Sequence, residues 1–325
     1  MNHTLIRLCA ALLLLGLGLF WHKPAEAQSV SCSASMSDVN FGSVNPQSSQ
    51  TDTTGTLNYS CTNTTGNPQT VALCFNLVGE DTDPRLMNDG AGDTLQYQLY
   101  TDSARTQPWG NAGGFGTEAQ ASIPKITSGQ TSTGSMTIYG RVKSGQTSAV
   151  PGNYADYFIL GFFTYTTHTG GGAPPSCLNT GFGSGWGFFN GFKATAQVTA
   201  QCTVSAVTLD FGAPAGVLTA AIPGTSTVSV QCASGITYNV GLDGGLNSGN
   251  NINTRKMVLG ANSVAYQLYR DSGRTLVWGN TVGTDTVAGT GNGSIQNLTV
   301  YGQVPAQPTP PAGTYQDTVV VSVTY

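Results

Sequence analysis

The sequence predicts an all-β fold made of two tandem antiparallel β-sandwiches. The first observation is a repeat, because YQLYTDSARTQPWGN at 97–111 and YQLYRDSGRTLVWGN at 266–280 agree at eleven of fifteen positions. The second is alternation of side chains with period two, which is typical of half-buried strands, without a comparable helical stripe. The third is composition, since charged residues make up 9% of the chain, against roughly 25% in typical soluble domains.

The repeat runs in the same order through both halves and therefore indicates a tandem duplication. Cys32 is followed nine residues later by Phe41-Gly42, and Cys202 is followed nine residues later by Phe211-Gly212. The segments 136–142 and 298–304 then correspond, as do 154–156 and 315–317. We expect a first domain over 28–190 and a second over 191–325, each of ordinary domain size.

Individual strands follow from the alternation within these segments. In 136–142 every second residue is apolar or glycine and falls on one face, and 298–304 repeats that pattern. The alternation continues through eight positions from Phe192 to Ala206, and 315–325 places alternate valines on one face. Such short alternating runs, separated by segments rich in Gly, Ser and Asn, are typical of antiparallel sandwiches.

The first 27 residues have the features of a secretory signal peptide. Arg7 precedes an apolar run from Leu8 to Phe20, and Ala25-Glu26-Ala27 supplies a cleavage site of small residues. The apolar run is shorter than the roughly 20 residues that a membrane-spanning helix needs. We therefore expect a signal peptide over 1–27 and an exported mature chain that begins near Gln28.

The charge of the mature chain argues against a nucleic-acid partner. Without Arg7, Lys23 and Glu26, ten basic and fifteen acidic side chains remain. Binding to phosphate backbones depends on clustered Lys and Arg, which this chain lacks.

The cysteines predict disulfides, because six remain in an exported chain once Cys9 leaves with the signal peptide. Among the fifteen possible pairings, the repeat favours the one in which the two copies match. The predicted bonds are Cys32–Cys61, Cys202–Cys232 and Cys74–Cys177. A metal site is not expected, since no C-x-x-C occurs and His168 is the sole histidine of the mature chain.

These landmarks resemble the spore coat protein U-like domain family, whose members form subunits of archaic chaperone-usher pili. The resemblance covers nearly the whole mature chain twice, through Cys-x9-Phe-Gly, YQLY-x-D-S-x-R-T-x-x-WGN and Tyr-Gly-x-Val. It implies an immunoglobulin-like, pilin-type β-sandwich that lacks its last strand. It also implies assembly by a periplasmic chaperone and an outer-membrane usher.

The end of the second copy matches that expectation. Tyr325 closes a strand whose counterpart in the first copy, 154–165, is followed by a further 25 residues. A sandwich that lacks its final strand exposes an apolar groove and an unpaired edge, which another chain can fill. We expect a chaperone to fill this groove first and the next pilus subunit later, on residues that share the open face: Val319, Val321, Val323 and Tyr325.

The start of the mature chain leads to a second expectation. Only residues 28–31 precede Cys32, whereas a donated strand needs roughly ten residues. The chain is therefore expected to receive a strand without donating one, which is the position of a tip subunit. Because Cys202 aligns with Cys32, the stretch 192–198 takes the place of a donor extension, and we hypothesise that it closes the first domain.

Catalytic chemistry is not expected, although Asp102, Arg105 and Trp109 resemble parts of an active site. The second copy holds the same three residue types at the same spacings, so a role in the fold explains both sets, with Asp and Arg pairing near a turn and Trp in the core. The alternative is an exported hydrolase, which needs an acid or nucleophile constellation in one copy, and none is evident. No cofactor is expected.

Surface binding is instead expected where the two copies differ. Only the first copy contains the Gly-rich aromatic segment 181–191 and the Gly-Gly-Phe sequence at 113–115. Exposed apolar loops of this kind bind hydrophobic or sugar surfaces. The candidates are Phe115, Val150, Phe182, Trp186, Phe188 and Phe189. In the alternative interpretation, the aromatics of 181–191 pack at the join between the domains.

The prediction is therefore a two-domain tip adhesin, exported through the periplasm to the cell surface and placed at the tip of a fimbrium. Its first domain binds abiotic or host surfaces and supports biofilm formation, and its second domain accepts a donor strand. The alternative is a non-adhesive subunit that has a structural role or initiates assembly.

Overall fold

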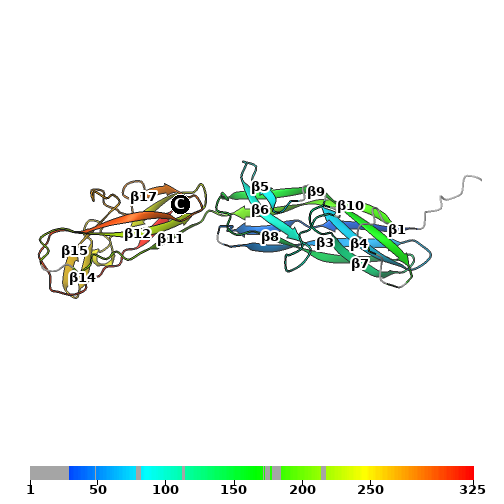
Figure 1. Ribbon diagram of the computed structural model, residues 1–325, viewed down its shortest axis with the longest axis horizontal. Coiled ribbons are helices and arrows are strands. Elements are labelled where there is room, and N and C mark those ends of the chain that lie inside the picture. The colour runs from blue at the N-terminus through cyan, green and yellow to red at the C-terminus, as the bar shows by residue number, and fades with distance from the viewer. Residues whose placement is uncertain are drawn as a thin grey trace, which may run out of the picture.

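The computed structural model describes residues 29–47, 49–77, 82–111, 114–170, 172, 176–177, 184–213 and 217–325. The chain forms two β lobes that lie end to end (Figure 1). The expectation for residues 1–27 falls outside the described residues. Within the described ranges, no helix is long and apolar enough to cross a membrane.

The first lobe is a curled sheet whose strands follow the order β1-β3-β8-β6-β5-β9-β10-β2, with β4 pairing β7 and β9. Strands β1 and β2 follow each other in the chain but stand at opposite ends of this order. The sheet therefore curls back on itself and encloses a core. Its strands are β1 (Val30–Met36), β2 (Val39–Val44), β3 (Thr51–Asn63), β4 (Gln69–Leu77), β5 (Arg85–Asn88), β6 (Thr94–Tyr100), β7 (Ala119–Ile126), β8 (Thr131–Val142), β9 (Gly152–Thr169) and β10 (Gly185–Val198).

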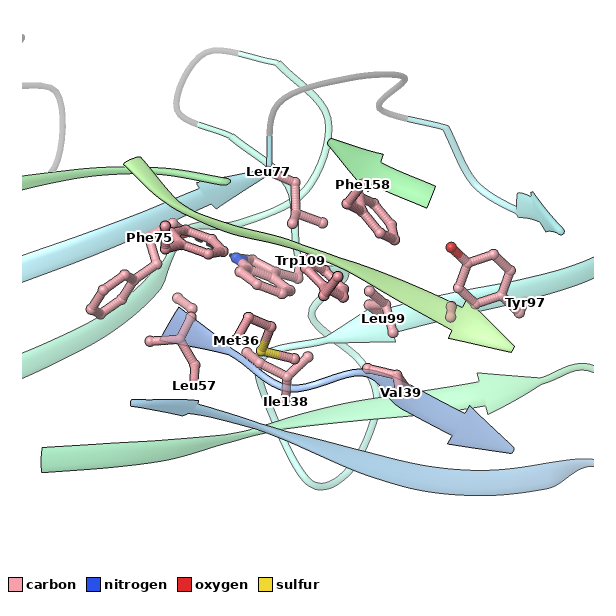
Figure 2. Close-up of a cluster of buried hydrophobic side chains, with 14 of the residues drawn as sticks. Met36, Val39, Leu57, Phe75, Leu77, Tyr97, Leu99, Trp109, Ile138 and Phe158 are labelled. Carbon is pink, nitrogen blue, oxygen red and sulfur yellow. Dashed lines mark hydrogen bonds between the residues drawn. The ribbon is translucent and has the colours of Figure 1, made fainter. Parts of the chain in front are cut away.

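Trp109 organises the core of the first lobe. Figure 2 shows it in the middle of the cluster, with Phe75 on one side and Leu99 and Tyr97 on the other. Its side chain is fully buried, and its indole Nε1 donates a hydrogen bond of 2.9 Å to the backbone oxygen of Phe75. A buried indole needs such a partner, so this bond holds the large ring in place beside β4.

The second lobe repeats the arrangement with the sheet divided into parts. One sheet has the order β11-β12-β18-β16, a second has β17-β13-β19, and β14 pairs with β15. Its elements are β11 (Cys202–Ala206), β12 (Ile222–Cys232), β13 (Thr237–Leu242), the 3₁₀ helix η1 (Leu246–Ser248), β14 (Lys256–Leu259), β15 (Asn262–Ala265), β16 (Gln267–Tyr269), β17 (Val287–Thr290), β18 (Gln296–Val304) and β19 (Val321–Thr324). The all-β fold predicted from the sequence is confirmed.

Strand β10 joins the two edges of the first lobe. It runs antiparallel to β9 over its whole length and parallel to β2 at residues 194–198. The predicted boundary between residues 190 and 191 falls inside this strand, and the change from one lobe to the next comes between Val198 and Cys202. The hypothesised closing stretch 192–198 thus pairs with strands of the first lobe.

The three disulfides have the predicted pairing. Cys32–Cys61 joins β1 to β3, and Cys202–Cys232 joins β11 to β12 at the equivalent place. Cys74–Cys177 ties β4 to the connection between β9 and β10. Both of its cysteines are buried, together with Ala72.

Candidate functional site: an unpaired groove and an exposed aromatic face

The second lobe contains a groove of about 610 Å³ between two segments that do not pair with each other. One wall is 206–211, which follows β11, and the other is 314–321, which leads into β19. The floor includes Val228, Leu268 and Val300 from the sheet beneath. In the first lobe, the corresponding space between β2 and β9 is filled by β10.

Residues that line the groove of the second lobe are less buried than their equivalents in the first lobe, where β10 covers them. The equivalence follows from the aligned Cys-x9-Phe-Gly and Tyr-x-Asp motifs. In each of four equivalent pairs, the residue of the first lobe is buried beside β10 and its counterpart in the second lobe is half-buried. The pairs, with the first-lobe residue given first, are Val39 and Leu209, Phe41 and Phe211, Tyr154 and Tyr315, and Phe158 and Val319. The groove therefore exposes apolar surface that the first lobe covers.

One wall of the groove is also an unpaired strand edge. Gln316 exchanges backbone hydrogen bonds with Val258, and the backbone oxygens of Thr318 and Val320 accept from the outer neighbours Leu246 and Asp243. The intervening Tyr315, Asp317 and Val319, which alternate toward the groove, form no backbone hydrogen bond within the described part of the chain. A row of free N–H and C=O groups beside apolar side chains is a template for an added strand.

Contacts between the walls and the floor define the shape of the groove. The rings of Phe211 and Tyr266 lie 6.1 Å apart, the same separation as Phe41 and Tyr97 in the first lobe. The Tyr266 hydroxyl donates a hydrogen bond of 2.7 Å to Asp317. Burial, followed by this bond, raises the pKa of Tyr266, so the phenol stays protonated and retains the contact. The wall at Asp317 is thus fixed to the floor.

The four residues predicted for the groove have different positions. Val319 and Val321 line it. Val323 packs partly buried against the core of the lobe, and Tyr325 is exposed. The sequence missed the opposite wall, although the repeat marks Phe211 as the counterpart of buried Phe41.

The first lobe carries an exposed aromatic face on β9 and β10. Trp186 is 51% exposed and Phe188 is 55% exposed, and their rings lie 5.6 Å apart. Phe162 of β9 contacts both, at 6.1 Å from Trp186 and 5.6 Å from Phe188. Trp186 and Phe188 stand near the start of β10, whose other end leads to the second lobe. The aromatic face therefore lies toward the far end of the first lobe.

The remaining surface candidates are distributed differently. Phe189 is 2% exposed and stacks on Trp109 at 6.3 Å, so it belongs to the core and cannot touch an external surface. Phe115 is half-buried beside Asn111, whose N–H bonds to its backbone oxygen. Val150 faces the second lobe, because its Cγ1 lies 3.7 Å from where a Cβ would stand on Gly235. Phe182 lies outside the described residues.

The expected loop over 181–191 is wrong for its described part, which belongs to β10 from Gly185 onward. Trp186 and Phe188 point outward because they alternate with Phe189 along a strand that pairs with β9. The alternative of packing between the lobes does not hold for these two residues, since their side chains are exposed.

Asp102 and Arg105 have structural roles, which differ from the predicted ion pair. Asp102 accepts hydrogen bonds from the backbone N–H groups of Thr106 and Gln107, and closes a turn. Arg105 has a φ of 58° and donates from Nε to the backbone oxygen of Gly140, 3.3 Å away. Its guanidinium pairs with Asp52, not with Asp102.

The second copy repeats these contacts, which supports the structural interpretation. Asp271 accepts from the N–H groups of Thr275 and Leu276, and Arg274, with a φ of 54°, donates to the backbone oxygen of Gly302. Among the described residues, no group of three His, Cys, Asp or Glu side chains is placed to hold a metal ion.

Asp271→Asn is expected to reduce the acid sensitivity of the second lobe. The N–H of Leu276 lowers the pKa of Asp271, so its charge stabilises the fold above the unfolded pKa of about 4. That stabilisation is lost as the pH falls through the lowered folded pKa. Thermal unfolding measured between pH 2 and 6 should therefore show a weaker pH dependence in the variant. An unchanged pH dependence in the Asp271→Asn variant would contradict the assignment.

Comparison with known proteins agrees with the duplication. The family model of the Spore Coat Protein U domain matches residues 24–160 and 189–322. Protein U of Myxococcus xanthus is 38% identical over 108 residues, which cover 31% of this chain and 60% of Protein U. The match thus spans less than two thirds of that relative.

One solved structure with a similar fold comes from a pilus system. A chain in the crystal structure of the CsuC-CsuE chaperone-tip adhesion subunit pre-assembly complex, from archaic chaperone-usher Csu pili of Acinetobacter baumannii, has a TM-score of 0.52 and 19% identity. The alignment covers 91% of this chain and 100% of that one. The CupB6 tip adhesin of Pseudomonas aeruginosa aligns with a TM-score of 0.37 and 9% identity, over 91% of this chain and 94% of the adhesin.

Proposed function

Because the chain belongs to the Spore Coat Protein U domain family, we propose that it is a subunit of a chaperone-usher pilus that acts by binding, not by catalysis. The observation that carries this proposal is the groove of the second lobe, with its unpaired edge at Tyr315, Asp317 and Val319. A subunit with such a groove needs a donated strand from a periplasmic chaperone, and later from the next subunit delivered by the outer-membrane usher.

The proposed roles of the two lobes follow from a structural difference, since the first lobe is completed by its own strand and the second has an open groove. The first lobe fills the equivalent space with its own β10, so it needs no donor. The second lobe is the acceptor, and it anchors the chain to the fibre. The first lobe is thus free to act at the tip of the fimbrium, on the cell surface to which the chain is exported.

The aromatic face supports an adhesive role for the first lobe. Trp186, Phe188 and Phe162 form a contiguous apolar contact on a strand-supported surface. Such a face is suited to binding apolar abiotic or host surfaces. Many pili on one cell bind at the same time, so that their individually weak contacts together give firm attachment and support biofilm growth. Phe115, which is half-buried, remains a separate candidate for surface binding, whereas Phe189 is excluded because it is buried.

Replacing Trp186 and Phe188 together with Ser is expected to reduce attachment of piliated cells to polystyrene by about tenfold or more, because it removes two exposed rings. Pilus assembly should be unchanged, since neither side chain lies in the groove or the core. The measurement is adhesion per cell, normalised to pilus protein at the cell surface. Ile295→Ser, at an apolar side chain that is 64% exposed on the second lobe, is the matched control.

Full attachment by the double variant would favour the alternative, a non-adhesive subunit that has a structural role or initiates assembly. If surface pili are lost together with attachment, the defect lies in assembly. Measuring the amount of pilus protein at the cell surface separates a defect in assembly from a defect in attachment.

A further inference from the structure

The two lobes contact each other beside the short connection 199–201. Gly293 is buried in a turn of the second lobe with a φ of 77°, and a Cβ added there would overlap the backbone oxygen of Thr147 in the first lobe. Nearby, the Cγ1 of Val150 lies 3.7 Å from where a Cβ would stand on Gly235, whose φ is 78°. Glycine combines a left-handed backbone with such a close approach. A side chain at position 293 would therefore push the lobes apart.

The connection between the lobes is hydrogen-bonded to both of them. The side-chain Nδ2 of Asn45, in the first lobe, donates a hydrogen bond to the side-chain oxygen of Gln201. The backbone oxygen of Gln201 accepts a hydrogen bond of 2.9 Å from the N–H of Ala233, which is 3% exposed in the second lobe. Gln201 therefore restrains the connection from both sides.

The first lobe holds its own side of the contact, the loop 143–151, in shape. Gln146 donates from Nε2 to the backbone oxygen of Gln96, 3.0 Å away. The hydroxyl of Tyr154 donates to the backbone oxygen of Val150, 2.8 Å away. These two hydrogen bonds position the residues of the loop that meet the second lobe.

The second lobe contains an equivalent loop, 305–313, which shows that this shape does not depend on the contact. Gln307 donates from Nε2 to the backbone oxygen of Ala265, and the hydroxyl of Tyr315 donates to the backbone oxygen of Pro311, as their counterparts do in the first lobe. The residues of this loop are exposed or half-buried. The loop therefore takes its shape without packing on another lobe.

The second lobe likewise builds its own side of the contact. The N–H of Gly293 donates to the backbone oxygen of Cys232 at 3.0 Å, and the side chain of Gln231 donates to the backbone oxygen of Gly293 at 2.8 Å. The N–H of Gly235 donates to the backbone oxygen of Gly291 at 3.0 Å. Cys232 forms the disulfide of this lobe, so the turns that receive the loop are anchored beside a covalent cross-link.

Domains that share a small interface usually move relative to each other, but here both sides of the contact are preformed, so little conformational freedom is lost when they meet. We propose that this interlobe contact, between the loop 143–151 and the turns 232–235 and 291–293, holds the two lobes in one orientation. The connection 199–201 is then not a free hinge, and the aromatic face keeps a fixed direction relative to the groove of the second lobe. The proposal goes beyond the proposed function, because it concerns the chain before it meets any partner.

A turn of the first lobe provides a matched control for Gly293. Gly129 precedes β8 as Gly293 precedes β18, its φ is 76°, and its N–H donates to the backbone oxygen of Asn63 at 2.7 Å. A Cβ added to Gly129 would meet nothing within 4 Å. A side chain therefore strains the backbone similarly at the two positions, and only the one at position 293 meets the other lobe.

The test measures how widely the distance between the lobes varies. Spin labels are attached at Thr137→Cys and Thr299→Cys, which are exposed on β8 and β18, and double electron–electron resonance gives the distribution of distances between the labels in the mature chain. A single narrow distribution is expected for this chain and for Gly129→Val, and Gly293→Val is expected to lose it. The proposal is overturned by a broad distribution in the otherwise unchanged chain, by an unaltered one in Gly293→Val, or by an equal loss in Gly129→Val.

A second variant changes the connection without altering the contact, and it decides the question if Gly293→Val does not fold. Insertion of Gly-Ser-Gly-Ser between Thr199 and Ala200 makes the connection longer and flexible, so lobes held by the connection alone would vary widely in distance. Lobes held by the contact keep the narrow distribution, which is the expected result. A broadened distribution would show that the short connection alone restrains the lobes, and would overturn the proposal. Both measurements use the mature chain by itself, so neither depends on attachment or on pilus assembly.

Discussion

A mature chain that carries its own donor strand is expected to have a second lobe that melts on the order of 10 °C higher than the unmodified lobe. The change is a four-residue turn after Tyr325, followed by a copy of 187–198. The added strand would pair with the free edge at Tyr315, Asp317 and Val319 and cover Leu209 and Phe211. Burying several half-exposed side chains contributes about 4 kcal/mol after the cost of ordering the strand. In a domain of this size, that corresponds to a shift of about 10–15 °C.

The measurement is differential scanning calorimetry, with the two lobes followed as separate transitions. The matched control carries the same extension with Asp at the positions that copy Phe192 and Ala194, which keeps the length and backbone but removes the apolar face. If both extensions leave the transition of the second lobe unchanged, the groove does not accept a strand and the proposed function fails.

Phe192→Ala is expected to destabilise the first lobe by about 3–5 kcal/mol, the usual cost of emptying a buried aromatic position. Phe192 is 5% exposed and stacks on Phe158 and Trp109. It therefore holds β10 onto the core from the middle of the strand. The loss is a large part of the roughly 5–15 kcal/mol that stabilises a typical domain. Denaturant unfolding followed by fluorescence measures it.

Phe188→Ala provides the comparison, because Phe188 stands on the same strand with its ring exposed. This variant should change the free energy of unfolding by less than about 0.5 kcal/mol. A Phe192 variant as stable as the Phe188 variant would mean that β10 does not belong to the core of the first lobe.

The sequence could predict the features that the duplication repeats. Cys32 and Cys202 mark the same disulfide in each lobe, and Trp109 and Trp278 are both fully buried with the indole bonded to a backbone oxygen. Alternation marked the inward positions of 192–198 because a strand with one covered face has period two. A repeat identifies such positions without any knowledge of their partners.

The sequence could not predict features that depend on which strands become neighbours. Phe189 and Phe188 are adjacent and chemically identical, yet one stacks on Trp109 and the other is exposed, since the strand register decides which side each ring takes. Arg255 is a further case. It is nearly fully buried, and its guanidinium donates to the backbone oxygens of Leu242, Asp243 and Trp278. A charged residue is normally expected at the surface, and only the fold brings these carbonyl groups around it.

Strand β10 also defines how mechanical force would pass through the molecule. It bears the exposed rings of Trp186 and Phe188 near its start, and its last residue, Val198, leads through three residues into β11. Tension between an attached surface and the fibre would therefore pull along the axis of this one strand. Its hydrogen bonds to β9 and β2 lie across that axis, so the load would shear many bonds at once instead of opening them one after another. The strand that completes the first lobe is thus also the element best placed to withstand detachment.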